Sequence, residues 1–131
     1  MLRRKIGRRV GGGAAVLVLI AAVTAPSALA QRTAAPKLVG NAKAGKAVFI
    51  STCSACHTLK AAGAQGQIGP NLDKTRLTEA TIVKAITNGG ATVMTKAQLA
   101  KYTTQMVAYK GVLSPAIINN IAAFVYTSTH K

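Results

Sequence analysis

The clearest pattern of apolar and polar positions lies near the C-terminal end of this 131-residue chain. Ser114 can cap a helix there, and Pro115 occupies the first helical position, where proline is favoured. The residues that follow place apolar side chains on one face at intervals of three and four: Ile117, Ile118, Ile121, Phe124 and Val125. The pattern predicts an amphipathic helix that buries this face.

Two further segments show helical signals of the same kind. Thr78 can cap a helix that carries Glu79 in its first turn, that Asn88-Gly89-Gly90 ends, and whose apolar face consists of Ile82, Val83 and Ile86. A short helix is expected from Lys96 to Tyr102, behind Thr95. The pattern between these helices and the C-terminal one predicts irregular chain.

An earlier helix is expected to begin after Asn41 and to end near Ser51. It contains Gly45, which costs about 1 kcal/mol relative to alanine in a helix and so requires a close packing contact or is simply tolerated. Phe49 lies four residues further on, on the same face. Glycine and proline interrupt residues 62–72 too often for a regular element. With no alternating strand pattern and no repeat, the fold class is predicted to be all-α.

The first thirty residues have the composition of a secretory signal peptide. A basic region at residues 3–9 precedes an apolar stretch of about a dozen residues, and Ala28-Leu29-Ala30 fits a cleavage site. The apolar stretch is shorter than the about 20 residues that span a bilayer, although an uncleaved anchor is the alternative. Residues 8 and 9 give only a weak twin-arginine pattern. Export to the periplasm or to the outer face of the cell membrane is therefore predicted.

The rest of the chain is predicted to form a flexible leader (residues 31–40) and one small domain (residues 41–131). Removal of residues 1–30 lowers the net charge from +15 to +10, because it takes away five basic residues and no acidic one. The remaining basic residues are dispersed, without the aromatic interleaving of a nucleic-acid site. They favour either a solvated surface or attraction to an acidic partner, and nucleic-acid binding is not expected. We expect a monomer.

The strongest chemical motif is Cys53-Ser54-Ala55-Cys56-His57, which contains the only two cysteines of the chain. This spacing is the attachment pattern of haem c: two thiols form thioether bonds to the porphyrin, and the adjacent imidazole binds the iron. A thioredoxin-like pair, half of a zinc site and a structural disulfide are the alternatives. A zinc site lacks ligands, since only His130 remains, and no alternating strand and helix pattern supports a thioredoxin. One covalently attached haem c is therefore predicted.

The opposite face of the iron needs a second ligand, and three residues have suitable donor atoms: Met94, Met106 and His130. A thioether favours reduced iron and raises the reduction potential, whereas an ordinary methionine fills a core. Met94 and Met106 both lie in irregular segments, and their positions favour Met106 modestly. His130 lies one residue from the end, where a solvated histidine is the simpler interpretation.

Taken together, residues 40–128 resemble the class I, mitochondrial-type cytochromes c, in the small bacterial monohaem form. The resembling segments, in chain order, are Gly45–Phe49, Cys53–His57, Gly69-Pro70-Asn71-Leu72, Met106–Ser114 and the segment around Phe124. The resemblance implies that three to five helices wrap around the haem, with the first and last helices crossing at Gly45. Val107 departs from the proline usual after the axial methionine, and the stretch before Met106 is long.

The same resemblance implies roles for individual residues. Cys53 and Cys56 would form the thioethers, His57 and Met106 would be the axial ligands, and the Pro70 carbonyl would accept a hydrogen bond from His57. The candidate haem pocket consists of Leu72, Ile82, Ile86, Tyr109 and Leu113. The expected function is one-electron transfer between redox proteins with acidic docking surfaces, without catalysis. The alternative is a haem sensor or haem enzyme with a labile sixth ligand, for which the chain offers no distal histidine and only two acids, Asp73 and Glu79.

Overall fold

The helices of the fold agree closely with those that the sequence predicts. The computed structural model describes residues 38–131; the expectations for residues 1–30 and for residues 31–37 of the leader lie outside the described residues. The described part contains four α-helices, α1 (Ala42–Thr52), α2 (Glu79–Asn88), α3 (Lys96–Lys101) and α4 (Pro115–Thr129). The predicted all-α fold class is confirmed. None of the helices described here is long and apolar enough to cross a membrane.

Each helix begins at a residue whose side chain accepts a hydrogen bond from the first turn. The Asn41 side chain accepts from the Ala44 N–H at 3.1 Å, and the Thr78 hydroxyl accepts from the Thr81 N–H at 3.2 Å. Ser114 caps α4 in the same way, and Thr95 forms a capping box with Gln98 at the start of α3. These caps satisfy N–H groups that have no partner within the helix, which is why the helix starts could be predicted from sequence.

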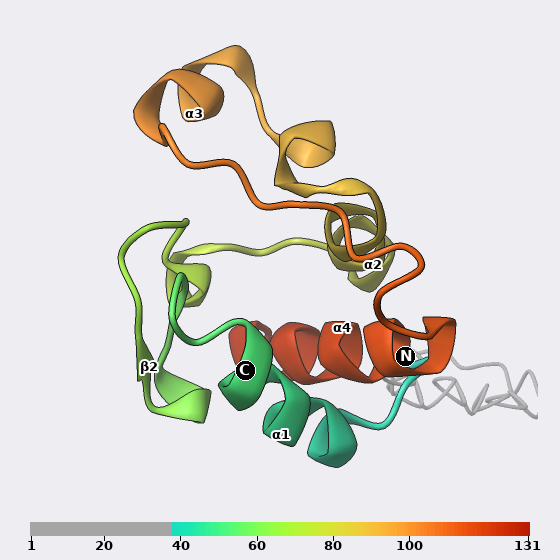
Figure 1. Cartoon of the computed structure of the whole chain (residues 1–131). Coiled ribbons are helices and arrows are strands. Elements are labelled where there is room, and N and C mark those ends of the chain that lie inside the picture. Colours follow the sequence, from blue (N-terminus) through green and yellow to red (C-terminus); the bar gives the residue numbers. More distant parts are fainter. Residues whose placement is uncertain (1–37) are drawn as a thin grey trace, which may run out of the picture. The chain divides into compact units, whose positions relative to one another are not determined.

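Helices α1 and α4 cross and form the base of the fold (Figure 1). The rings of Phe49 and Phe124 meet edge to face, with their centroids 5.6 Å apart and their planes at 63°. Gly45 lies at the crossing, where a Cβ atom would stand 1.9 Å from the carbonyl oxygen of Asn120. The glycine within α1 therefore allows the two helix backbones to approach, and the crossing expected for the first and last helices is confirmed.

Helix α2 packs against α4 and completes the hydrophobic core with Ile82 and Ile86. The largest fully buried side chains are Phe49, Leu59 and Ile121. Helix α3, joined to α2 through the 3-10 helix η3 (Gly90–Val93), lies apart from the α1–α4 crossing (Figure 1). All five of its residues other than Leu99 are exposed.

Residues 58–74 contain short elements that the sequence does not predict. Strand β1 (Thr58–Leu59) pairs antiparallel with β2 (Ala64–Gln65), so that Thr58 faces Gln65. The 3-10 helix η1 (Lys60–Ala62) lies between the strands, and η2 (Leu72–Lys74) follows them. Two residues are too few to show an alternating pattern, which explains why the strands were not foreseen. Gly63 connects η1 to β2 with a φ of +66°, a conformation that glycine adopts without strain.

Candidate haem site

The end of α1 turns sharply and brings the motif of residues 53–57 to the inside of the fold. The N–H of Cys53 donates to the carbonyl of Phe49 at 2.8 Å, and the N–H groups of Cys56 and His57 both donate to the carbonyl of Cys53, at 3.2 and 3.0 Å. These hydrogen bonds hold the five residues in a compact turn. As a result, both thiols and the imidazole line the same cavity.

The cavity has a volume of about 330 Å³ and mostly apolar walls. Its lining includes four of the five pocket residues proposed from the sequence: Leu72, Ile82, Ile86 and Tyr109. Leu113 is not part of the lining; it is half-buried and packs against the hydrophobic core instead. Helix α4 contributes Ile121 and Val125, which the sequence analysis assigned to the core and not to the site.

The ring of His57 is oriented by one hydrogen bond. Its Nδ1 lies 2.9 Å from the carbonyl oxygen of Pro70. Because a carbonyl oxygen can only accept, the ring must carry its proton on Nδ1 and donate it to Pro70. In the neutral ring this tautomer leaves the lone pair on Nε2, the atom that is then able to bind a metal ion.

Gly69 lies directly against the His57 ring. A Cβ atom on Gly69 would stand 2.7 Å from the Cε1 of His57 and 3.0 Å from its Nδ1, so any larger residue would displace the imidazole. From the sequence, Gly69 is expected in a turn-rich stretch and in the segment that resembles the family, without a contact to His57. Its proximity to a histidine thirteen positions earlier could not be read from local sequence, although the Gly69-Pro70 pair in the family pattern was a signal.

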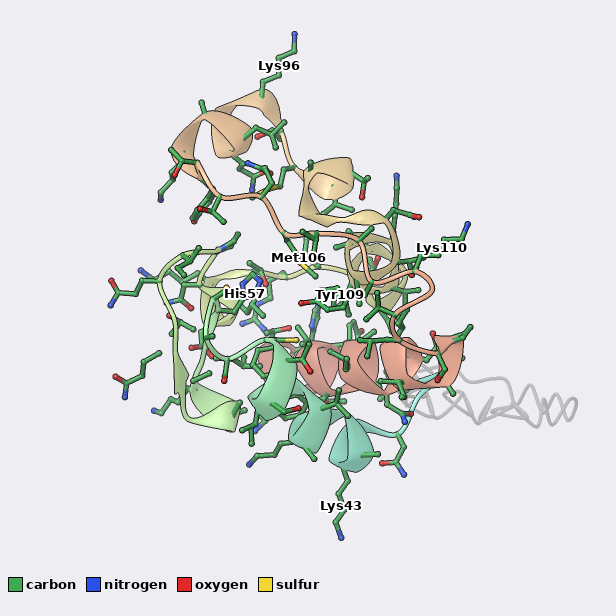
Figure 2. All side chains as sticks on the ribbon, viewed as in Figure 1. Lys43, His57, Lys96, Met106, Tyr109 and Lys110 are labelled. Atoms are coloured by element: carbon green, nitrogen blue, oxygen red, sulfur yellow. The ribbon has the colours of Figure 1, made fainter. Side chains whose placement is uncertain are left out.

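Met106 is placed by hydrogen bonds between its segment and the end of α2. The N–H groups of Tyr109 and Lys110 donate to the carbonyls of Ile86 and Thr87 at 2.9 and 3.1 Å, and the Gly90 N–H donates to the Met106 carbonyl at 3.1 Å. The first two bonds use carbonyl groups at the end of α2 that have no partner within the helix. Figure 2 shows that Met106 and His57 approach the cavity from different segments and face each other across it.

Gly90 lies against the Met106 side chain, a contact that the sequence analysis also missed. A Cβ on Gly90 would stand 3.0 Å from the Cβ of Met106 and 3.8 Å from its sulfur. The neighbouring Gly89 has a φ of +91° and would bring its own Cβ to 3.0 Å from the Met106 carbonyl oxygen. The two glycines therefore end α2, as predicted, and also leave room for the methionine.

The other two candidate ligands differ in their relation to the cavity. Met94 lines it, as Met106 does, so the choice between the two methionines is not made by proximity alone. His130 is exposed and absent from the lining; its ring stacks on Tyr126 with centroids 4.1 Å apart. The interpretation of His130 as a terminal, solvated residue agrees with this position.

The two thiols are free in the structure. Burial, and to a lesser extent the neighbouring Cys56, raise the pKa of Cys53 from 9.0 to about 11, so this thiol stays neutral at physiological pH. Burial and the two cysteines also raise the pKa of Tyr109, which stays neutral as well. Residues 38–131 contain no cluster of three or more His, Cys, Asp or Glu side chains that could hold a metal ion. A zinc site built on Cys53 and Cys56 therefore finds no further protein ligands there.

These residues fit a covalently attached haem. The cavity offers apolar walls for the porphyrin, two thiols on one side, an imidazole nitrogen with a free lone pair, and a thioether on the facing wall. Imidazole and thioether are the donor pair typical of cytochromes c. The fit is judged by the cavity and by the donor atoms. Within residues 38–131, every buried polar side-chain atom already has a hydrogen-bond partner, so none needs the haem as its partner.

Comparisons with known proteins give the same picture. Residues 40–125 match the family described as Cytochrome C oxidase, cbb3-type, subunit III. Among solved structures, the chain is similar to the c-type cytochrome SorU from Sinorhizobium meliloti, with 28% identity and a TM-score of 0.52 over 69% of this chain and 92% of that one. A comparison with curated proteins finds no match. The chain thus belongs to the cytochrome c family, as a small class I-like domain of the cbb3-type subunit III kind, and it is a haem-binding protein of electron transfer.

Proposed function

We propose that this protein is an exported monohaem cytochrome c that carries one electron at a time between redox proteins. The observation that supports the proposal most is the common cavity of Cys53, Cys56, His57 and Met106. The signal-like composition of residues 1–30 supports export. The haem motif supports it as well, because haem c is attached outside the cytoplasmic membrane. The single Cys-x-x-Cys-His motif supports one haem per chain.

In this proposal, Cys53 and Cys56 would hold the haem by thioethers, and His57 and Met106 would be the ligands of its iron. The haem supplies an iron that changes its charge by one electron. His57 is oriented by Pro70, and Met106 lies on a segment held by two main-chain hydrogen bonds to the end of α2 and one to Gly90. Because the main chain holds both ligand segments, neither needs to move when the charge of the iron changes.

The apolar walls of the cavity exclude water from the iron. Leu72, Ile82 and Ile86 contribute to these walls. An apolar surrounding and a thioether ligand both disfavour the more highly charged oxidised iron, so the reduction potential is expected to be high for a haem protein. Neither of the two acidic residues of the chain, Asp73 and Glu79, lies in the cavity lining. The arrangement suits electron transfer better than catalysis.

The decisive experiment is a visible spectrum of the oxidised and the reduced protein, followed by a potentiometric titration. We expect a c-type spectrum with one haem per chain, a one-electron titration curve, and a reduced form that does not bind carbon monoxide. A colourless protein would contradict the haem assignment. A reduced form that binds carbon monoxide readily would instead indicate the sensor or enzyme with a labile sixth ligand.

A further inference from the structure

Three hydrogen bonds join residues 56–60, at the end of the haem motif and just after it, to residues 69–73, which follow strand β2. Each of them connects two residues that are thirteen positions apart. The Gly69 N–H donates to the Cys56 carbonyl at 2.8 Å, and the His57 Nδ1 donates to the Pro70 carbonyl at 2.9 Å. In the third, the Lys60 N–H donates to the carboxylate of Asp73, with both oxygens within reach at 3.0 and 3.1 Å. Residues 56–60 and 69–73 thus run side by side in a fixed register.

The bond made by His57 lies between the other two. Its acceptor is a main-chain carbonyl, so its length depends on where residues 69–73 lie relative to residues 56–60. Gly69 lies beside the imidazole with no room for a side chain between its backbone and the ring. The outer end of this pair of segments is tied by a side chain alone, and that side chain belongs to Asp73.

Asp73 lies outside the cavity lining, so it does not contact a haem there directly. Its side chain is exposed, and its carboxylate accepts from the Lys60 N–H. The Asp73 N–H in turn donates to the side chain of Asn71 at 2.9 Å, which fixes the start of η2. In a chain with only two acidic residues, one of them therefore ties the Pro70 segment to the first residue of η1.

We propose that Asp73 is a positioning residue for His57, which it holds indirectly by keeping the Pro70 carbonyl at hydrogen-bond distance from Nδ1. The inference rests on the proposed function, in which His57 binds the iron. A hydrogen bond from Nδ1 makes an imidazole a stronger electron donor and so favours oxidised iron. Loss of the Asp73 contact lengthens that bond, weakens the donation and raises the reduction potential.

A higher reduction potential in Asp73→Ala is also expected from charge alone, because removal of a carboxylate near the iron raises the potential. Lys60 separates the two causes. Proline at position 60 removes the N–H that Asp73 accepts while the carboxylate stays, and position 60 opens a 3-10 helix behind an extended residue, where proline fits. Losing the lysine charge lowers the potential by electrostatics, whereas losing the hydrogen bond raises it.

The test uses the full haem-loaded protein with Asp73→Ala, Lys60→Pro and Lys60→Gln, and with Glu79→Gln as the charge control. Glu79 accepts from the N–H of Val39, in another part of the fold. Reduction potential and the exchange rate of the His57 ring proton, measured by nuclear magnetic resonance, are the two readouts. We expect Asp73→Ala and Lys60→Pro to raise the potential and to speed exchange about tenfold. Lys60→Gln should lower the potential slightly. Neither Lys60→Gln nor Glu79→Gln should change the exchange rate of the His57 ring proton.

The outcomes that contradict the proposal are distinct from those that contradict the function. If Lys60→Pro lowers the potential as Lys60→Gln does, or if ring-proton exchange is unchanged in Asp73→Ala, Asp73 acts only as a charge and the proposal is wrong. Should Asp73→Ala fail to fold, Lys60→Pro alone decides. If the unsubstituted protein shows no iron-shifted signals from the His57 ring, the proposed ligation itself is wrong.

Discussion

Gly45 in α1 lies directly against the main-chain carbonyl of Asn120 in α4, with no room for a side chain between the two helices. A Cβ at position 45 would stand 1.9 Å from the Asn120 oxygen and 2.4 Å from its carbonyl carbon. The obstacle is backbone, which cannot turn aside as a flexible side chain could. Gly45 is therefore required for the close approach of α1 and α4 at this point.

We predict that Gly45→Ala destabilises the haem-loaded protein, even though alanine favours an isolated helix by about 1 kcal/mol. The helices must separate, and overpacking of this kind costs about 1–3 kcal/mol or more. Chemical denaturation followed by circular dichroism measures the change. Ala44→Gly, at the exposed neighbouring position, is the matched control and should cost about 1 kcal/mol. Equal or greater stability of Gly45→Ala would show that the crossing is not close-packed in solution.

Gly90→Ala is predicted to weaken the bond between Met106 and the iron. The new methyl group would stand 3.0 Å from the Met106 Cβ, so the methionine side chain must shift. We expect the sulfur–iron charge-transfer band of the oxidised protein to lose intensity, and the reduced protein to bind carbon monoxide more readily. Ala91→Ser, at an exposed position beside it, should leave both unchanged. An unaltered band in Gly90→Ala would argue against Met106 as the ligand.

Substitution of each methionine identifies the ligand directly, because Met94 and Met106 both line the cavity. Met106→Ala should abolish the charge-transfer band, open the reduced iron to carbon monoxide and lower the reduction potential. Met94→Ala should leave the band in place, and its free energy of unfolding should fall by no more than the loss of a partly buried side chain explains. The reverse result would move the axial ligand from Met106 to Met94.

The haem-free chain is predicted to be largely unfolded. Among residues 38–131, only Phe49, Leu59 and Ile121 are large and completely buried, and many of the other apolar side chains line the haem cavity. A chain with Cys53→Ala and Cys56→Ala, which cannot attach haem, should show little helix by circular dichroism. A cooperative thermal transition of that chain would contradict the prediction.

Electron exchange with charged reagents is predicted to depend on ionic strength, because the positive charge of residues 31–131 is large. Lysines project from several elements, with Lys43, Lys96 and Lys110 pointing outward in Figure 2. Oxidation by ferricyanide, an anion, should slow as salt increases, and oxidation by a cationic cobalt complex should accelerate. Rates that do not respond to salt would show that charge does not guide the encounter.

Much of the fold was predictable because it depends on local chemistry. Asn41, Thr78, Thr95 and Ser114 each cap the helix that follows, and a cap needs only the next three residues. The packing role of Gly45 was predicted from the family pattern and not from local sequence, because its partner in α4, Asn120, lies far along the chain. The strands β1 and β2 escaped prediction because pairing of two residues leaves no periodic trace.

The residues of the site that belong to a sequence motif could be predicted. Those that act by leaving space for a neighbouring side chain could not. The spacing of residues 53–57 led directly to the thiols and the imidazole of the cavity. Gly69 and Gly90 escaped because the function of a glycine there is to leave room for His57 or Met106, and an empty volume has no sequence pattern. Leu113 was assigned to the pocket on hydrophobicity, which cannot distinguish a cavity wall from the adjoining core.

Helix α4 follows the other described elements of the cavity along the chain, which has a consequence for the order of assembly. Ile121 and Val125 of α4 form part of the cavity wall, whereas Cys53, Cys56 and His57 lie in the first half of the chain. Since synthesis proceeds from the N-terminus, the thiols emerge long before the helix that closes over them. The cavity therefore stays open until α4 has been made, and α4 completes its wall.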